Sequence, residues 1–231
     1  MKDPTWTLQP ELTRREAVLG LVYLPFHVLA LPQLLGALAL AHPGLTVAVA
    51  NGILYGVAAV FTALVFGKRL YAHYCIWVEN GGRVLLSLAR GYLLFMALTV
   101  VVTLILPAAE AEELVNPNNE AVLSLTGVDF RVTHALAIFI APIVEEVLFR
   151  GVLFASLREK NVYSAYVVTF FVFALAHLWQ FFGQEGQLWL YALQYLPISL
   201  GLCYCYEKSG CLWTPILLHM LNNMMAYNML R

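Results

Sequence analysis

The chain has little charge for its length. Only 12% of its 231 residues are Asp, Glu, Lys or Arg, whereas soluble domains carry about 25%. Its hydrophobic content is 61% and its mean hydropathy is +0.75. These values exclude an ordinary soluble domain and predict a membrane protein. With a net charge of −1, the chain lacks the basic stripe that neutralises phosphates, so we expect no nucleic-acid partner.

Cysteine is also scarce. The four cysteines, Cys75, Cys203, Cys205 and Cys211, form no CxxC pair and lie in or beside apolar segments. This spacing implies neither a disulfide framework nor a zinc ribbon. Residues 1–20 lack a short apolar core followed by a small-residue cleavage site, so we expect no removed signal peptide. The chain also has no cysteine four residues from its end, so we do not expect it to be a prenylation substrate itself.

Long apolar runs dominate the rest of the chain. They predict about seven membrane-spanning helices, at residues 17–41, 44–66, 91–107, 134–155, 161–182, 187–206 and 211–229. Pro25 and Pro32 predict a kinked or broken first helix. Residues 70–90 predict an interfacial amphipathic segment interrupted at Gly81-Gly82. The expected fold class is an all-α, polytopic membrane bundle.

Basic residues divide unevenly between the predicted loops. If the N-terminus is cytoplasmic, the residues that fall inside are Lys2, Arg14, Arg15, Lys68, Arg69, Arg83, Arg90, Arg158, Lys160 and Lys208. Only Arg131 and Arg231 fall outside, and the outer loop 108–130 is acidic. This pattern follows the positive-inside rule and predicts a cytoplasmic N-terminus. A bacterial inner membrane and a eukaryotic internal membrane fit equally well.

Three charged residues interrupt one apolar run. Glu145, Glu146 and Arg150 lie between Ala135 and Ser156, where each charge costs about 2.5–3.5 kcal/mol at the bilayer centre. Glu146 and Arg150 are four residues apart and share a helix face, which predicts an ion pair. Glu145 points about 100° away from Glu146 and has no cation nearby in the sequence.

Two later spans carry further polar side chains. His177 ends an apolar run, and His219 lies four residues before Asn223 on one helix face. At 1.5 Å per residue from the cytoplasmic edge, Glu145 lies about 15 Å deep, His177 about 24 Å, His219 about 12 Å and Asn223 about 18 Å. We therefore expect a carboxylate, two imidazoles and an amide in one buried layer.

Three motifs carry these residues in order. Residues 145–150 match EExxxR, residues 173–177 match FxxxH, and residues 219–223 match HxxxN. Together they resemble the CAAX protease and bacteriocin-processing family, also called the CPBP or Abi family, which includes the type II CAAX prenyl proteases. The resemblance covers about residues 130–229. It implies an intramembrane endopeptidase, a class that is conventionally labelled metalloprotease.

The resemblance also implies roles for single residues. Glu145 is expected to act as general base, with His177 as its partner in activating water. His219 and Asn223 are expected to stabilise the oxyanion, and Glu146 is expected to pair with Arg150 and hold the helix. Residues 131–231, the last four helices, are then the catalytic core. Residues 1–130 supply the N-terminal transmembrane and interfacial helices and the acidic extracytoplasmic loop, in one compact bundle.

The need for a cofactor stays open. Glu145, His177 and His219 offer the two nitrogens and one oxygen that suit a catalytic zinc ion. The sequence lacks HExxH, however, and Asn223 suits an oxyanion donor better than a zinc ligand. We favour a metal-free glutamate mechanism, in which the carboxylate activates water and donors stabilise the oxyanion.

Two other functions remain as alternatives. The polar layer suits a non-catalytic Abi-like immunity or scaffold protein that holds a membrane partner. A proton or metal carrier also places Glu and His at the midplane, but spans one to three lack acidic or histidine relays. For the enzyme, the expected partners are the lipid bilayer and a peptide or protein at the membrane. That substrate is a prenylated CAAX tail or a bacterial peptide, and the oligomeric state is left open.

A few other polar residues have no matching partner in the sequence. We expect loop or interface positions for His27, His42, His73 and His134. Asn222 is expected to form a hydrogen bond between helices.

Overall fold

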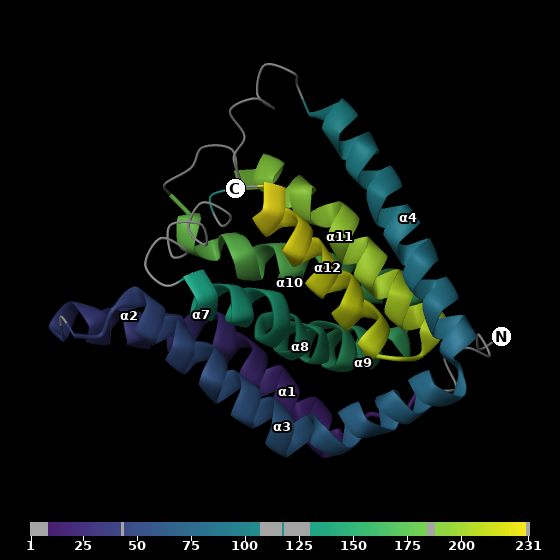
Figure 1. Cartoon of the computed structure of the whole chain (residues 1–231), viewed down its shortest axis with the longest axis horizontal. Helices are drawn as coiled ribbons and strands as arrows, with labels where there is room; N and C mark the ends of the chain where they lie inside the picture. The colour runs from purple at the N-terminus through teal and green to yellow at the C-terminus, as the bar shows by residue number, and fades with distance from the viewer. Residues whose placement is uncertain (1–8, 43, 107–116, 118–129, 184–187, 230–231) are drawn as a thin grey trace.

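The computed structural model describes residues 9–42, 44–106, 117, 130–183 and 188–229. In these residues every regular element is a helix and no strand is present, which confirms the all-α fold (Figure 1). The N-terminal half contains α1 (Arg14–Pro25), the π-helical segment η2 (Phe26–Ala30), α2 (Leu31–Ala41), α3 (Val47–Glu79) and α4 (Gly81–Ile105). The predicted acidic loop 108–130 lies almost entirely outside the described residues.

The C-terminal half begins with one unbroken helical run and continues with three separate helices. The run consists of α7 (Phe130–Ala135), η3 (Leu136–Ile140), α8 (Ala141–Glu146), η4 (Val147–Phe154) and α9 (Ala155–Arg158). The helices that follow are α10 (Val162–Leu178), which ends in the short 3₁₀ segment η5 (Trp179–Phe181), α11 (Leu188–Ser209) and α12 (Trp213–Met229).

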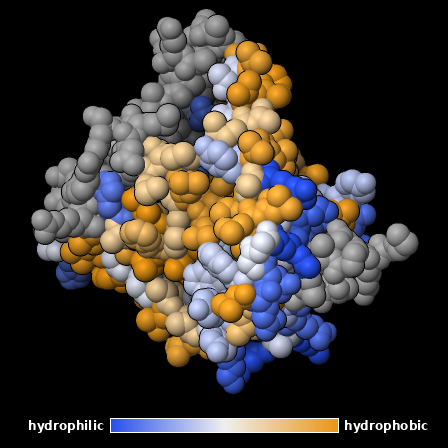
Figure 2. Space-filling model, turned by 45° about the vertical axis from the view of Figure 1, so that its right-hand side comes forward, coloured by the Kyte–Doolittle hydropathy of each residue, from blue (hydrophilic) through white to orange (hydrophobic). Residues whose placement is uncertain are grey.

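Five described helical stretches are long and apolar enough to cross a membrane. They are Arg14–Ala41, Val47–Glu79, Gly81–Ile105, Val162–Phe181 and Leu188–Ser209. Their large apolar side chains lie on the outside, as for Leu40, Leu64 and Leu104, and hydrophobic residues cover much of the face in Figure 2. Such exposure is costly in water and favourable in lipid. The chain is therefore a multi-pass membrane protein.

The other two predicted spans are helical but less apolar or shorter. The run from Phe130 to Arg158 contains the charged residues Glu145, Glu146 and Arg150, and α12 has 17 residues. The predicted interfacial segment 70–90 forms the end of α3 and the start of α4. The break lies at Asn80, whose side-chain Nδ2 donates a hydrogen bond to the carbonyl of Ile76 at 3.2 Å.

Two prolines lie just after π-helical turns. Pro32 follows η2, where Leu31 N–H bonds to the carbonyl of Phe26, and Pro142 follows η3, where Ala141 N–H bonds to the carbonyl of Leu136. Proline lacks an N–H and its ring clashes with the carbonyl four residues earlier. A wider turn before the proline relieves that clash, so the helix continues past Pro32 instead of breaking.

Close helix contacts hold the site elements in place. Helix α4 runs along α11 (Figure 1), and Gly91 and Gly201 face each other at their crossing. A Cβ atom on Gly201 would lie only 3.1 Å from the carbonyl oxygen of Gly91. Small residues of this kind allow helix backbones to approach closely in a membrane. The contact positions α11 beside the helices that carry the polar residues.

Hydrogen bonds join the two halves at one end of the bundle. Arg69 of α3 donates to the carbonyl of Pro10 at 2.8 Å and to the hydroxyl of Tyr206 at 3.3 Å. Trp213 donates its indole N–H to the carbonyl of Leu70 at 3.1 Å. His73, expected at an interface, is instead fully buried in this region. These contacts anchor the start of α12, the helix that carries His219.

Candidate active site

A buried ion pair lies at the start of η4. Arg150 donates from Nη1 to Glu146 Oε1 at 2.9 Å, and both side chains are 0% exposed. From α11, Ser199 accepts hydrogen bonds from Arg150 Nη2 at its carbonyl and its Oγ, at 3.3 Å each. The guanidinium carbon also lies 4.6 Å from the ring centroid of Phe173. The charge on Arg150 is thus compensated by contacts to three other helical elements.

Glu146 also fixes the orientation of His219. The Nδ1 atom of His219 lies 2.8 Å from Glu146 Oε1, the same oxygen that accepts from Arg150. An oxygen paired with a guanidinium acts as an acceptor, so Nδ1 of His219 carries the proton and donates. A carboxylate in this position holds an imidazole in one tautomer and one orientation. The other ring nitrogen, Nε2, then faces Glu145.

His177 is held in a matching way at the end of α10. Its Nδ1 lies 2.8 Å from the carbonyl oxygen of Phe173, which can only accept, so Nδ1 again carries the proton. The imidazole also lies against the ring of Tyr195, with centroids 4.9 Å apart and an interplanar angle of 34°. These two contacts direct Nε2 of His177 towards Glu145.

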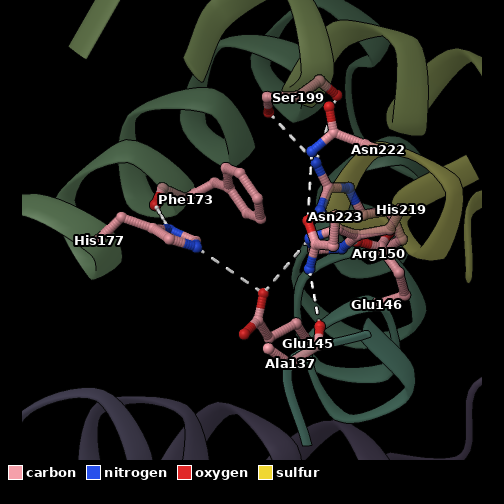
Figure 3. Close-up of polar contacts among 10 residues, drawn as sticks. All are labelled: Ala137, Glu145, Glu146, Arg150, Phe173, His177, Ser199, His219, Asn222 and Asn223. Atoms are coloured by element: carbon pink, nitrogen blue, oxygen red, sulfur yellow. Dashed lines mark hydrogen bonds and ion pairs between the residues drawn. The ribbon is translucent and has the colours of Figure 1, made fainter. Parts of the chain in front are cut away.

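Glu145 lies between the two imidazoles (Figure 3). Its Oε2 is 3.8 Å from Nε2 of His177 and 3.8 Å from Nε2 of His219. The side chains are 13%, 19% and 5% exposed for Glu145, His177 and His219 respectively. A separation of 3.8 Å is too long for a direct hydrogen bond and suits one bridging water molecule. One carboxylate oxygen therefore lies close to a ring nitrogen of each of two imidazoles.

Asn223 lies next to these residues but is already partly engaged. Its Nδ2 donates to the carbonyl of Ala137 in η3 at 2.9 Å, and its Oδ1 accepts from Asn222 Nδ2 at 3.2 Å. One amide hydrogen of Asn223 is used in the bond to Ala137, and the second can be donated to another acceptor. The expectation for Asn222, a bond between helices, is replaced by this bond to its neighbour on α12.

The structure brings together residues from α8, α10 and α12 that the motifs singled out. Glu145 and Glu146 point in different directions, as their spacing predicts, and Glu146 faces Arg150. The roles assigned to Glu145, His177, His219 and Asn223 stay predictions.

His27 is a site neighbour that the sequence interpretation misses. Instead of a loop or interface position, it lies in η2, is only 7% exposed and feels the charge of Glu145. Its position in the middle of the first apolar helix is a usable signal, because ionisable residues inside membrane spans are rare and often functional. Tyr195 has no comparable signal, since aromatic residues are common in apolar helices.

The spacing of the side chains also bears on the metal alternative. Among the residues that the structure describes, no group of three His, Cys, Asp or Glu side chains is arranged to hold a metal ion. Glu145, His177 and His219, the candidate ligand set, are all among these described residues.

The fold is an all-α membrane bundle in which a carboxylate lies between two oriented imidazoles. Residues 128–225, which carry all three motifs, match the family model described as "Type II CAAX prenyl endopeptidase Rce1-like". The matched segment covers less than half of the chain, and the match confirms the resemblance drawn from the motifs. Comparison with curated proteins and with solved structures found no match.

Proposed function

We propose that this protein hydrolyses a peptide bond of a membrane-associated peptide or protein, with a water molecule activated by Glu145. The observation that carries this proposal is the position of Glu145 Oε2, at 3.8 Å from the Nε2 atoms of both His177 and His219. A water held there contacts a carboxylate base and two imidazoles. The family match supports the same reaction class.

The reaction takes place in two steps. The water oxygen adds to the carbonyl carbon of the substrate while its proton moves to Glu145, with His177 Nε2 helping to hold the water. The tetrahedral intermediate then collapses, the C–N bond breaks, and Glu145 returns the proton to the leaving nitrogen. The products are a carboxylic acid and an amine, and the Glu145 carboxylate is regenerated.

The proposed oxyanion donors are His219 and Asn223. Since Nδ1 of His219 already donates to Glu146, Nε2 can donate only when the ring is protonated. The Glu146 carboxylate stabilises that imidazolium, as an oriented carboxylate does in other histidine-based sites. Asn223 offers its second amide hydrogen.

The proposed substrate class is a prenylated CAAX tail, which the description of the matching family favours over a bacterial peptide. The test uses the purified full chain in detergent with a farnesylated CAAX peptide and a peptide library. We expect cleavage by the parent and a loss of at least about 100-fold in kcat for Glu145→Gln and His219→Ala. The matched control is Glu159→Gln, at an exposed position at the end of α9. Unchanged kcat in Glu145→Gln would refute the assignment.

We further propose that hydrolysis proceeds without a metal ion. Its support is chemical, since Glu145 and the two imidazoles suffice to activate water and Asn223 suits an oxyanion donor. Exhaustive chelation followed by assay in metal-free buffer is expected to leave the activity unchanged. Loss of activity that is restored by Zn²⁺ would contradict this part of the proposal.

The proposed orientation places the N-terminus in the cytoplasm. Arg69, Arg158 and Lys208 belong to one end of the bundle, because Arg69 contacts Tyr206 and Arg158 contacts the adjacent Glu207. Basic residues gathered at one end support a cytoplasmic assignment of that end. Figure 2 shows hydrophilic residues concentrated towards one side of the molecule. Reporter fusions at the two termini would test this, with the N-terminal fusion expected on the cytoplasmic side.

A further inference from the structure

Two polar side chains lie on one face of the first helical stretch, outside the matched segment 128–225. Tyr23 of α1 and His27 of η2 are four residues apart, and their rings stack with centroids 5.7 Å apart at an angle of 20°. They are only 8% and 7% exposed. Tyr23 Oη and His27 Nδ1 are both buried without a hydrogen-bond partner among the described residues.

These two residues border the site. Gly20 of α1 lies against Val152 of η4, seven residues after Glu145, and His27 is within electrostatic range of Glu145. Tyr23 packs in the same apolar cluster as Val144, the residue before Glu145, and as Tyr195, which contacts His177. Helix α1 also packs directly against η4 (Figure 1). The two unpartnered polar atoms therefore lie on the helical stretch that packs against the run carrying Glu145.

Packing alone does not explain the Tyr23 hydroxyl. The Tyr23 ring stacks on Phe61 with centroids 3.8 Å apart, and a phenylalanine would make the same stack. A buried hydroxyl or ring nitrogen without a partner destabilises a folded protein. Two such groups side by side at an active site are typical of a surface that gains its hydrogen bonds when a ligand binds.

We propose that Tyr23 and His27 form a subsite that hydrogen-bonds the backbone of the peptide substrate beside the bond held at Glu145. This inference rests on the proposed peptidase function. A peptide offers both N–H donors and C=O acceptors, and Tyr Oη and His Nδ1 can each donate or accept. The subsite belongs to the N-terminal helices, so the part of the chain outside the family match takes part in substrate binding.

The test compares steady-state kinetics of the purified full chain and its variants on the farnesylated CAAX peptide. Tyr23→Phe and His27→Leu are expected to raise KM about 3- to 10-fold with less than about 2-fold change in kcat, the effect of one lost hydrogen bond. His27→Asn, which keeps a hydrogen-bonding group near the Nδ1 position, is expected to recover part of the loss. The matched controls are Tyr163→Phe and His42→Leu, both at exposed positions, and their KM should equal the parental value.

Thermal unfolding separates this role from a structural one. Because Tyr23→Phe removes an unpartnered hydroxyl, its melting temperature should equal or exceed that of the parent while its KM rises. If the parent cleaves, Glu145→Gln does not, and Tyr23→Phe and His27→Leu keep the parental KM, the subsite is refuted and the peptidase function stands.

If the parent cleaves nothing, the proposed function fails, and binding decides the subsite separately. Fluorescence anisotropy would then measure binding of a labelled farnesylated CAAX peptide to the parent and the variants. An affinity that falls in both Tyr23→Phe and His27→Leu supports the subsite. Equal affinity in all forms, or no binding to the parent, overturns it.

Discussion

Removing Arg150 should destabilise the protein more than any other single loss of charge in the described helices. Arg150 and Glu146 are 0% exposed, and Arg150→Met leaves the Glu146 carboxylate buried without its cation. Breaking a buried pair from one side costs about 3–5 kcal/mol, a large part of a typical stability of about 5–15 kcal/mol. Arg150→Met also loses the hydrogen bonds to Ser199 and the contact with Phe173.

A second variant tests the cause of that loss. In Glu146→Gln/Arg150→Met the buried carboxylate is gone as well, so we expect the double variant to recover at least about 2 kcal/mol relative to Arg150→Met. Its activity should stay low, because the neutral amide that replaces the Glu146 carboxylate no longer supports a protonated His219. The double variant therefore separates stability from catalysis.

The assay is reversible unfolding of the purified chain in mixed micelles, followed by circular dichroism. The matched control is Arg158→Met, which breaks a partly exposed pair with Glu207 and should cost about 0.2–1 kcal/mol. The reasoning is refuted if Arg150→Met costs no more than Arg158→Met. It also fails if the double variant is no more stable than Arg150→Met.

Three further predictions follow from packing and hydrogen bonding. Gly91→Ala should destabilise the protein by about 1–3 kcal/mol in a thermal melt, because the new methyl group would overlap a cysteine side chain of α11. The control is Gly56→Ala, whose methyl group meets no atom within 4 Å, so this variant should be neutral or stabilising. Asn222→Ala removes the hydrogen bond to the neighbouring asparagine and should lower kcat about 3- to 10-fold with KM unchanged; an unchanged kcat would contradict a positioning role. Iodoacetamide should modify the half-buried Cys75 before the fully buried Cys211, as measured by mass spectrometry. Equal rates of modification at the two cysteines would contradict this prediction and show that the turn between α11 and α12 opens readily.

Local features of the fold were accessible from the sequence. Apolar runs of about 20 residues predicted the membrane helices, because a span must satisfy all its backbone hydrogen bonds internally. The ends of those helices were less accessible. Residues 70–90 looked like a separate segment because they contain charges, yet α3 and α4 continue through them on either side of Asn80. Side-chain contacts such as Arg69 with Tyr206 make charged residues acceptable in long helices, and these partners are distant in the sequence.

For the candidate site too, some features follow from the sequence and others only from the tertiary structure. The sequence by itself determined that Glu146 pairs with Arg150 and that Glu145 points elsewhere, because both follow from helical spacing within one element. Only the tertiary structure decided that Glu145 lies between His177 and His219, because that depends on how α8, α10 and α12 are rotated against one another. The tertiary structure also decided which ring nitrogens of His177 and His219 face Glu145, because an acceptor holds the Nδ1 atom of each ring. Those relations join residues far apart in the chain, and packing and hydrogen bonds between helices establish them.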